Sequence, residues 1–245
     1  MKKSLRLFLL YTVFFLIAGI LFRHISGTGT RSSDIQPEKT VFAKSDSRKP
    51  DPVFTGEDYK PLAGRTVILD PGHGGNDPGM ALDDIYEKDI NLHISEKLQK
   101  LLTELGCTVL ATRKDDSYVS LENRIQLTDD QKADLFISIH LNATDEDTVS
   151  SGVESYYNDS SCHESRQLAE AVQAGVVNKT GARDRGARGD SDLYVVRKTV
   201  IPSCLIEAGF LTSDTERPLL LSDSYQTRIA EGIAEGILQY LSADK

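Results

Sequence analysis

From residue 62 onward, short apolar runs alternate with stretches in which apolar residues recur at helical spacing. This alternation predicts an α/β domain with a single open mixed, mostly parallel sheet and helices on both faces. We expect strands at 65–70, 107–113, 133–140, 152–158, 193–196 and 203–210, and helices at 90–105, 121–131, 163–179 and 224–242. A chain of 245 residues is long enough for one sizeable core of this kind.

The first 61 residues have a different character. Residues 7–22 are sixteen uncharged positions that follow Lys2, Lys3 and Arg6. As a helix they would span about 24 Å, close to the hydrocarbon core of a bilayer. Residues 1–25 are therefore predicted to be a signal anchor or a cleavable signal peptide, and the absence of a clear cleavage site after Phe22 favours the anchor.

That segment predicts an extracytoplasmic protein, either membrane-anchored by residues 7–22 or secreted after cleavage. Residues 26–61 are polar and mixed in charge, and they show no helix or strand period. They are predicted to be a flexible polar linker. The catalytic domain is then expected at 62–245, so the membrane would be contacted through the N-terminal segment only.

Charge is unevenly distributed along the chain. The total is 28 basic and 37 acidic residues; three basic residues fall in 1–22, and seven basic and six acidic residues fall in 23–62. Residues 63–245 therefore carry 18 basic and 31 acidic residues, a net charge of -13. This acidity argues against a nucleic-acid partner, which needs a basic surface. Three cysteines without a C-x-x-C pair argue against a disulfide framework, and Cys107 and Cys204 are expected to be buried thiols.

Ionisable residues stand at the carboxyl ends of predicted strands, where open α/β sheets build their sites. His73 follows the first strand, His140 ends the strand at 133–140, and Glu207 lies in the last one. Glu87 begins the first helix at the same edge, where a helix N-terminus favours an anion. The four residues are thus expected to converge.

Two imidazoles and one carboxylate are a common ligand set for catalytic zinc, and a further carboxylate can serve as general base for the hydrolysis of an amide. We expect His73, Glu87 and His140 as ligands and Glu207 as the base, although by pattern alone the two glutamates could exchange roles. Glu207 follows an apolar run, and a buried carboxylate should face a metal or a cation.

Other readings of these residues are weaker. A lone histidine is more often a satisfied structural residue than a ligand, and His93 and His163 are expected to be structural residues of this kind. The glycine-rich PGHGGNDPG loop matches neither of the common phosphate-binding motifs. Glycines on both sides of His73 instead allow the turns that direct a side chain into a cleft.

Four motifs in order, VILDPGHGGNDPG, EKDINL, SIHLNA and LIEAGFLTSDTE, resemble those of the zinc-dependent N-acetylmuramoyl-L-alanine amidases, the amidase-3 family. The resemblance covers roughly residues 63–242. It implies Zn²⁺ bound by His73, Glu87 and His140, with Glu207 as the catalytic residue. It also implies a peptidoglycan substrate, cut at the amide between the muramic acid lactyl group and L-alanine. Three residues depart from the family pattern: Met80, Leu141 and Ser213. Three others are candidates for substrate contact: Asn142, Arg188 and Arg197.

The hydrophobic N-terminal segment, SIHLNA and the ending YQTRIAEGIAEGILQYL resemble the sporulation and germination-related amidases of endospore formers. That resemblance implies a role in spore cortex maturation, in which a partner polysaccharide deacetylase completes muramic-δ-lactam formation. A vegetative cell-wall autolysin of the same chemistry is the alternative. Two more distant ones are a different zinc hydrolase acting on the same polymer and a non-catalytic peptidoglycan-binding domain.

Overall fold

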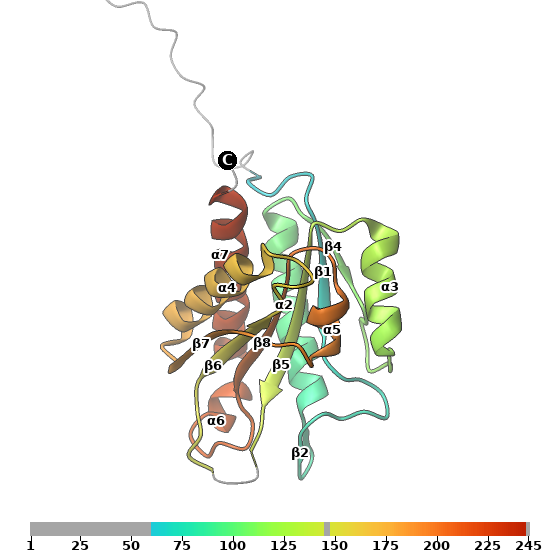
Figure 1. Cartoon of the computed structure of the whole chain (residues 1–245). Coiled ribbons are helices and arrows are strands. Elements are labelled where there is room, and N and C mark those ends of the chain that lie inside the picture. The colour runs from blue at the N-terminus through green and yellow to red at the C-terminus, as the bar shows by residue number, and fades with distance from the viewer. Residues whose placement is uncertain (1–59, 145–147, 244–245) are drawn as a thin grey trace, which may run out of the picture. The chain divides into compact units, whose positions relative to one another are not determined.

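A six-stranded mixed sheet forms the centre of the domain (Figure 1). The computed structural model describes residues 60–144 and 148–243, so the expected anchor and nearly all of the expected linker lie outside the described residues. The strands follow the order β4-β1-β5-β8-β6-β7. Their bounds are β1 Thr66–Pro71, β4 Thr108–Ala111, β5 Leu135–Asn142, β6 Val153–Tyr157, β7 Asp184–Gly189 and β8 Ser203–Phe210.

Most strand pairs are parallel, as the sequence predicts. β4, β1, β5 and β8 run parallel to one another, β6 pairs antiparallel with β8, and β7 runs parallel to β6. The parallel strands therefore bring their carboxyl ends to one edge of the sheet, where the predicted site residues were expected.

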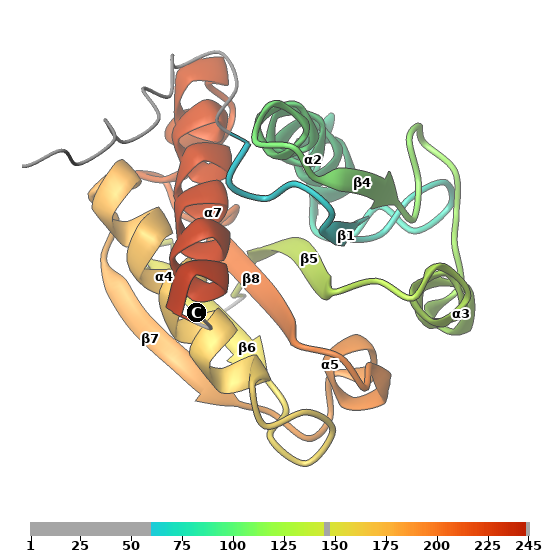
Figure 2. The ribbon, with the colours of Figure 1, turned by 90° about the horizontal axis from the view of Figure 1, so that it is seen from above.

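Helices cover both faces of the sheet, which confirms the predicted fold class (Figure 2). Along β1, Val67 and Leu69 belong to one core and Ile68 belongs to the other, because successive strand residues point to opposite faces. The larger core lies beneath α2 Glu87–Glu104, α4 Ser165–Thr180 and α7 Asp223–Ala243, and the smaller one beneath α3 Leu121–Gln131 and α5 Tyr194–Lys198.

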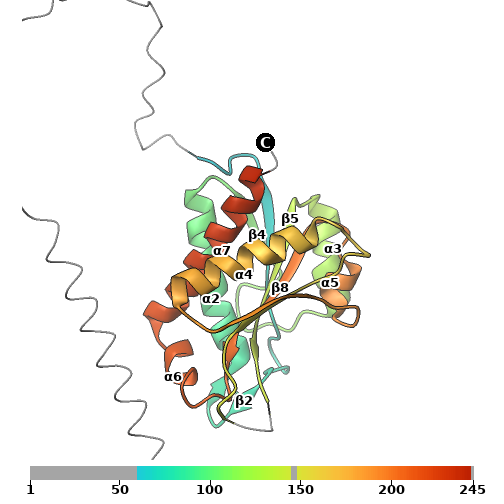
Figure 3. The ribbon, with the colours of Figure 1, turned by 60° about the vertical axis from the view of Figure 1, so that its left-hand side comes forward.

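Glycines let α4 and α7 cross at close range (Figure 3). A Cβ built on Gly175 of α4 would lie 2.2 Å from the carbonyl oxygen of Gly232 on α7, and one on Gly236 would lie 2.5 Å from Cα of Val172. Only glycine permits this backbone approach, which closes the larger core.

Within residues 60–144 and 148–243, no helix combines the length and apolarity needed to cross a bilayer.

The predicted strand at 193–196 is wrong, because this segment begins the short helix α5. Asp190 Oδ1 accepts hydrogen bonds from the backbone N–H groups of Asp192 and Leu193, and this turn directs the chain into the helix. Val195 and Val196 then pack against the smaller core. A single helical turn thus buries the β-branched residues that suggested a strand.

The sequence also missed several elements. Edge strand β7 reads DRGARG, which has neither β-branched residues nor an apolar alternation that would predict it. The hairpin of β2 Ala81–Leu82 and β3 Ile85–Tyr86 and the helix α6 Arg217–Leu220 are too short to produce a period. By contrast, Cys107 and Cys204 are buried and free, as expected.

Candidate metal and catalytic site

Three of the predicted site residues meet at the carboxyl edge of the sheet. His73 follows β1, His140 lies in β5, and Glu87 is the first residue of α2. Their potential ligand atoms all lie within 4.8 Å of one another. Glu87 Oε1 is 3.2 Å from His73 Nε2 and 3.1 Å from His140 Nδ1, and the two imidazole rings are nearly perpendicular, at 78°. The structure thus assembles the nitrogen, nitrogen and oxygen donors that the sequence predicted.

Glu87 is the buried member of this cluster. Its Oε1 accepts a hydrogen bond from the backbone N–H of Leu141, and its Oε2 accepts one from that of Met80. Burial opposes ionisation, but hydrogen bonds with His140 and His73 outweigh it and hold the pKa of Glu87 well below its usual range. The cluster therefore presents a carboxylate between two imidazoles, a donor set suited to a divalent cation.

A left-handed backbone conformation and closely approached glycines shape the loop that carries His73. His73 itself has a φ of 62°, in the left-handed region that favours glycine. A Cβ on Gly72 would lie 2.2 Å from the His140 ring, and one on Gly79 would lie 2.5 Å from Glu87 Oε2. Asp77 Oδ2 lies 2.9 Å from His73 Nδ1 and so directs Nε2 toward Glu87. Burial lowers the pKa of His73, but Glu87 and Asp77 together raise it to about 9.

Two buried arginines hold this loop in place. Arg124 donates hydrogen bonds to the Asp70 carboxylate, at 2.6 Å, and to the carbonyl oxygens of Pro71 and His73. Arg113 donates to the carbonyl oxygens of Pro71 and Gly72, each at 2.9 Å. All three carbonyls from Pro71 to His73 therefore accept from a guanidinium group. Neither arginine is predictable from the sequence, because a lone arginine carries no motif.

Glu207 occupies the next strand. It is the register partner of His140 on β5, and on its other side it is the partner of Glu154 on β6. Its buried Oε2 has no hydrogen-bond partner among the described residues. Burial raises the pKa of Glu207 to about 7. A carboxylate that is directed beside the histidine cluster and carries an unused oxygen is suited to receive a proton.

A cavity of about 350 Å³ opens beside the two histidines. His73 and His140 contribute to its wall, and apolar and aromatic residues that precede or begin α3 and α5 also line it: Tyr118, Val119, Leu121, Leu193, Tyr194 and Val195. The cavity therefore combines charged and imidazole groups with a largely apolar lining.

The three candidates for substrate contact occupy different surroundings. Asn142 lies at the end of β5, where its Oδ1 accepts from the backbone N–H of Ala143. The Arg197 guanidinium packs 5.6 Å from the ring of Tyr194, which lines the cavity. Arg188, on β7, forms an ion pair with Glu154.

His93 and His163 lie exposed, outside the cluster of His73, Glu87 and His140.

Glu154, the register partner of Glu207 on β6, was not predicted as a site residue, although it is only 2% exposed. The available signal was an acid in the predicted strand GVESYYN, at a position that shares a face with Tyr156 of the smaller core. Burial and the neighbouring Glu154 raise the pKa of Tyr156 to about 12, so that its hydroxyl stays protonated.

Comparison with known proteins identifies this arrangement. Residues 67–239 match the family model of the amidase-3 group, described as N-acetylmuramoyl-L-alanine amidase. The chain belongs to this family. Membership makes it a peptidoglycan amidase, in agreement with the resemblance of its four motifs and with its fold.

Solved structures and a curated relative agree with that assignment. An N-acetylmuramoyl-L-alanine amidase from Clostridium difficile 630 is 40% identical, with a TM-score of 0.70 over 75% of this chain and 100% of that one. The CwlD amidase from Clostridioides difficile, solved in complex with the GerS lipoprotein, is 36% identical, with a TM-score of 0.70 over 74% and 100%. The probable cell wall amidase LytH of Staphylococcus aureus is 34% identical over 190 residues, which are 76% of this chain and 62% of LytH.

The arginine contacts generate a prediction about stability. Arg124→Gln should lower the free energy of unfolding by about 3–5 kcal/mol, because it leaves the buried Asp70 carboxylate without its cation. Denaturant unfolding of the purified chain measures this change. Arg166→Gln, which removes an exposed ion pair with Glu170, is the control and should change the value by no more than about 0.5 kcal/mol. Equal effects of the two substitutions would contradict the role given to Arg124.

Proposed function

We propose that this chain is a zinc-dependent N-acetylmuramoyl-L-alanine amidase that hydrolyses the amide between the muramic acid lactyl group and L-alanine of the stem peptide. The observation that carries the proposal is the cluster of His73, Glu87 and His140, whose ligand atoms lie within 4.8 Å, with Glu207 beside it on the adjacent strand. Family membership supports the choice of substrate.

The donor set fits a catalytic zinc ion. His73, Glu87 and His140 would hold it, and the cluster includes no thiolate of the kind that closes structural zinc sites. Gly72 and Gly79 leave the space between the ligands free of side-chain atoms. When bound, zinc supplies Lewis acidity and lowers the pKa of a coordinated water to about 7.

Glu207 would move the protons. Its free Oε2 can accept a proton from the attacking water and return it to the leaving amine of L-alanine, which departs as a neutral group. The cavity lined by Tyr118 and Tyr194 would hold the substrate next to His140, the register partner of Glu207. Asn142, Arg188 and Arg197 are the side chains we assign to substrate contact.

The biological setting we infer is the spore cortex. The N-terminal segment 1–25 would place the domain outside the cytoplasm, and a polysaccharide deacetylase would complete the muramic-δ-lactam. The likeness to CwlD and the motifs shared with sporulation amidases support this setting. A vegetative autolysin is the second candidate, and the likeness to LytH favours it.

Digestion of purified peptidoglycan tests the reaction. With Zn²⁺ present, the chain should release stem peptides that begin with a free L-alanine amine, and mass spectrometry of the products identifies them. Cleavage between two amino acids, or loss of acetate from the sugars alone, would rule out the amidase assignment. A heat-inactivated sample is the control for spontaneous release.

Two substitutions separate metal binding from proton transfer. Glu207→Gln should retain zinc but lose about 10²–10⁴-fold in turnover, because only the proton acceptor is removed. His140→Ala should lose zinc as well, since it removes a ligand. Metal content by elemental analysis and the rate of product release measure the two effects. Full activity of Glu207→Gln would show that another group is the base.

A strain without this protein distinguishes the two settings. If the spore role is correct, its spores should lack muramic-δ-lactam, while the muropeptides of growing cells stay unchanged. The muropeptide profiles of spores and of growing cells measure both. Altered profiles in growing cells, with normal spores, would instead identify a vegetative autolysin.

A further inference from the structure

An ion-pair cluster around a buried carboxylate lies next to Glu207, on the side away from the histidines. Glu154 of β6 is the central carboxylate and is 2% exposed. Arg188 Nε lies 2.8 Å from its Oε1, and Arg185 Nε lies 3.6 Å from its Oε2. Both arginines come from edge strand β7 and contact Glu154 on the neighbouring strand β6.

The cluster carries an excess of positive charge. Two guanidinium groups face one carboxylate, which leaves one net positive charge in a portion of the chain, residues 63–245, whose net charge is -13. Arg185 is committed to the fold, because its guanidinium also packs 5.0 Å from the Phe210 ring. The Arg188 side chain remains 55% exposed.

Arg188 still has donors to offer. Its Nε faces Glu154, and its Nη2 donates to the carbonyl oxygen of Arg185 at 3.3 Å, while Nη1 makes no hydrogen bond to the described residues. A guanidinium held along one edge presents its remaining N–H groups as a preorganised fork, and carboxylates match that fork.

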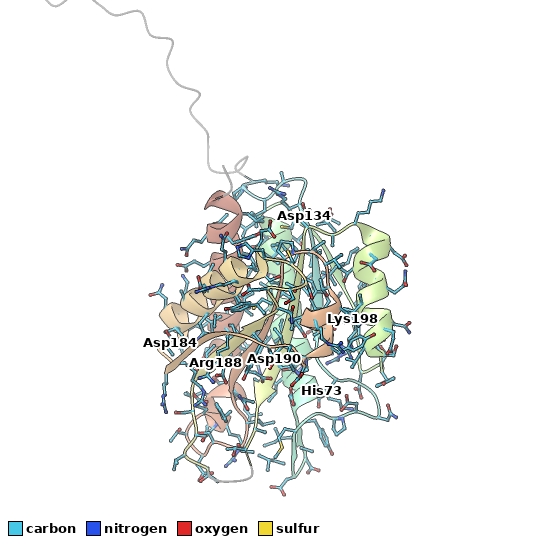
Figure 4. The ribbon with its side chains drawn as sticks, viewed as in Figure 1. His73, Asp134, Asp184, Arg188, Asp190 and Lys198 are labelled. Carbon is cyan, nitrogen blue, oxygen red and sulfur yellow. The ribbon has the colours of Figure 1, made fainter. Side chains whose placement is uncertain are left out.

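The position of Arg188 relative to Glu207 sets the reach of a ligand. Glu154 and Glu207 are register partners, and adjacent strands lie about 4.8 Å apart. Arg188 contacts Glu154 from β7, the strand on the far side of β6, so its guanidinium lies more than one strand spacing from Glu207. Figure 4 labels His73 and Arg188, which come from opposite sides of β5 and β8 in the order of the sheet.

We infer that Arg188, positioned by Glu154, binds a carboxylate on the peptide part of the substrate, on the residue that follows L-alanine. The inference rests on the proposed amidase function and adds a specificity determinant to it. Two extended residues span about 7 Å, so a carboxylate on the second residue reaches Arg188 while the cleaved amide lies beside Glu207. A carboxamide at that position would lose the charge-assisted bonds.

Two synthetic substrates test the inference. Both are N-acetylmuramoyl-L-alanyl dipeptides; the second residue is D-glutamate with its carboxylates free in one and the D-glutamic acid diamide, with carboxamides in their place, in the other. The zinc-loaded full chain should cleave the carboxylate form with a kcat/KM about tenfold higher. In Arg188→Gln the ratio of the two values should fall toward one, and in Arg188→Lys, which keeps the charge but not the fork, it should be intermediate.

The ratio also serves as an internal control. Any loss of folded protein lowers both rates together, so destabilisation from unpairing Glu154 does not change the ratio. Arg166→Gln, which alters an exposed arginine on α4, should keep the wild-type ratio. A wild-type ratio near one, or an Arg188→Gln variant that keeps the tenfold ratio, would overturn the inference while leaving the amidase function intact. Cleavage of neither substrate would overturn the proposed function and, with it, this inference.

Discussion

The Asp70–Arg124 ion pair is the interaction on which the site depends. Both side chains are almost fully buried, and removing two charges from water is costly unless their remaining hydrogen-bonding capacity is used. Here it is used: Ser138 and Thr112 donate to the Asp70 carboxylate, while Arg124 also donates to backbone carbonyls. The pair therefore ties the end of β1 to α3 and to β5. Without that tie, the His73 loop would lose one of the two guanidinium groups that fix its position relative to His140.

Strand register does the rest of the positioning. His140, Glu207 and Glu154 are successive partners across β5, β8 and β6, so they form one row on the same face of the sheet. Charge changes along that row, from the imidazole through two carboxylates to the guanidinium of Arg188. A row of this kind requires no loop to order it, because backbone hydrogen bonds already set the spacing between its members. Only His73 and Glu87 depend on a turn and a helix start for their place.

The sequence predicted the parts of the fold that have a strong local signal. Helix α3 occurs at the predicted residues 121–131, and five of the six predicted strands are present with small shifts at their ends. The segment at 193–196 was misjudged, because two valines favour a strand locally while the preceding turn at Asp190 and the smaller core favour a helix. The cluster of His73, Glu87 and His140 was predictable because chain polarity brings strand ends, and the start of the helix that follows β1, to one edge of the sheet. Arg113, Arg124 and Glu154 were not, because their partners are defined only by the fold; Arg124 and Asp70, for example, are 54 residues apart.

The acidic domain places several of its arginines next to the candidate site. Four arginines contact carbonyl or carboxylate oxygens beside the site. Arg113 and Arg124 do so at the His73 loop, and Arg185 and Arg188 at Glu154. A net charge of -13 over residues 63–245 disfavours contact with anionic polymers. Surface charges are screened within about 8 Å at physiological ionic strength, so an oriented guanidinium acts only on a group close to it. Such a domain is suited to distinguish ligands by the charges that come close to its row of charged side chains.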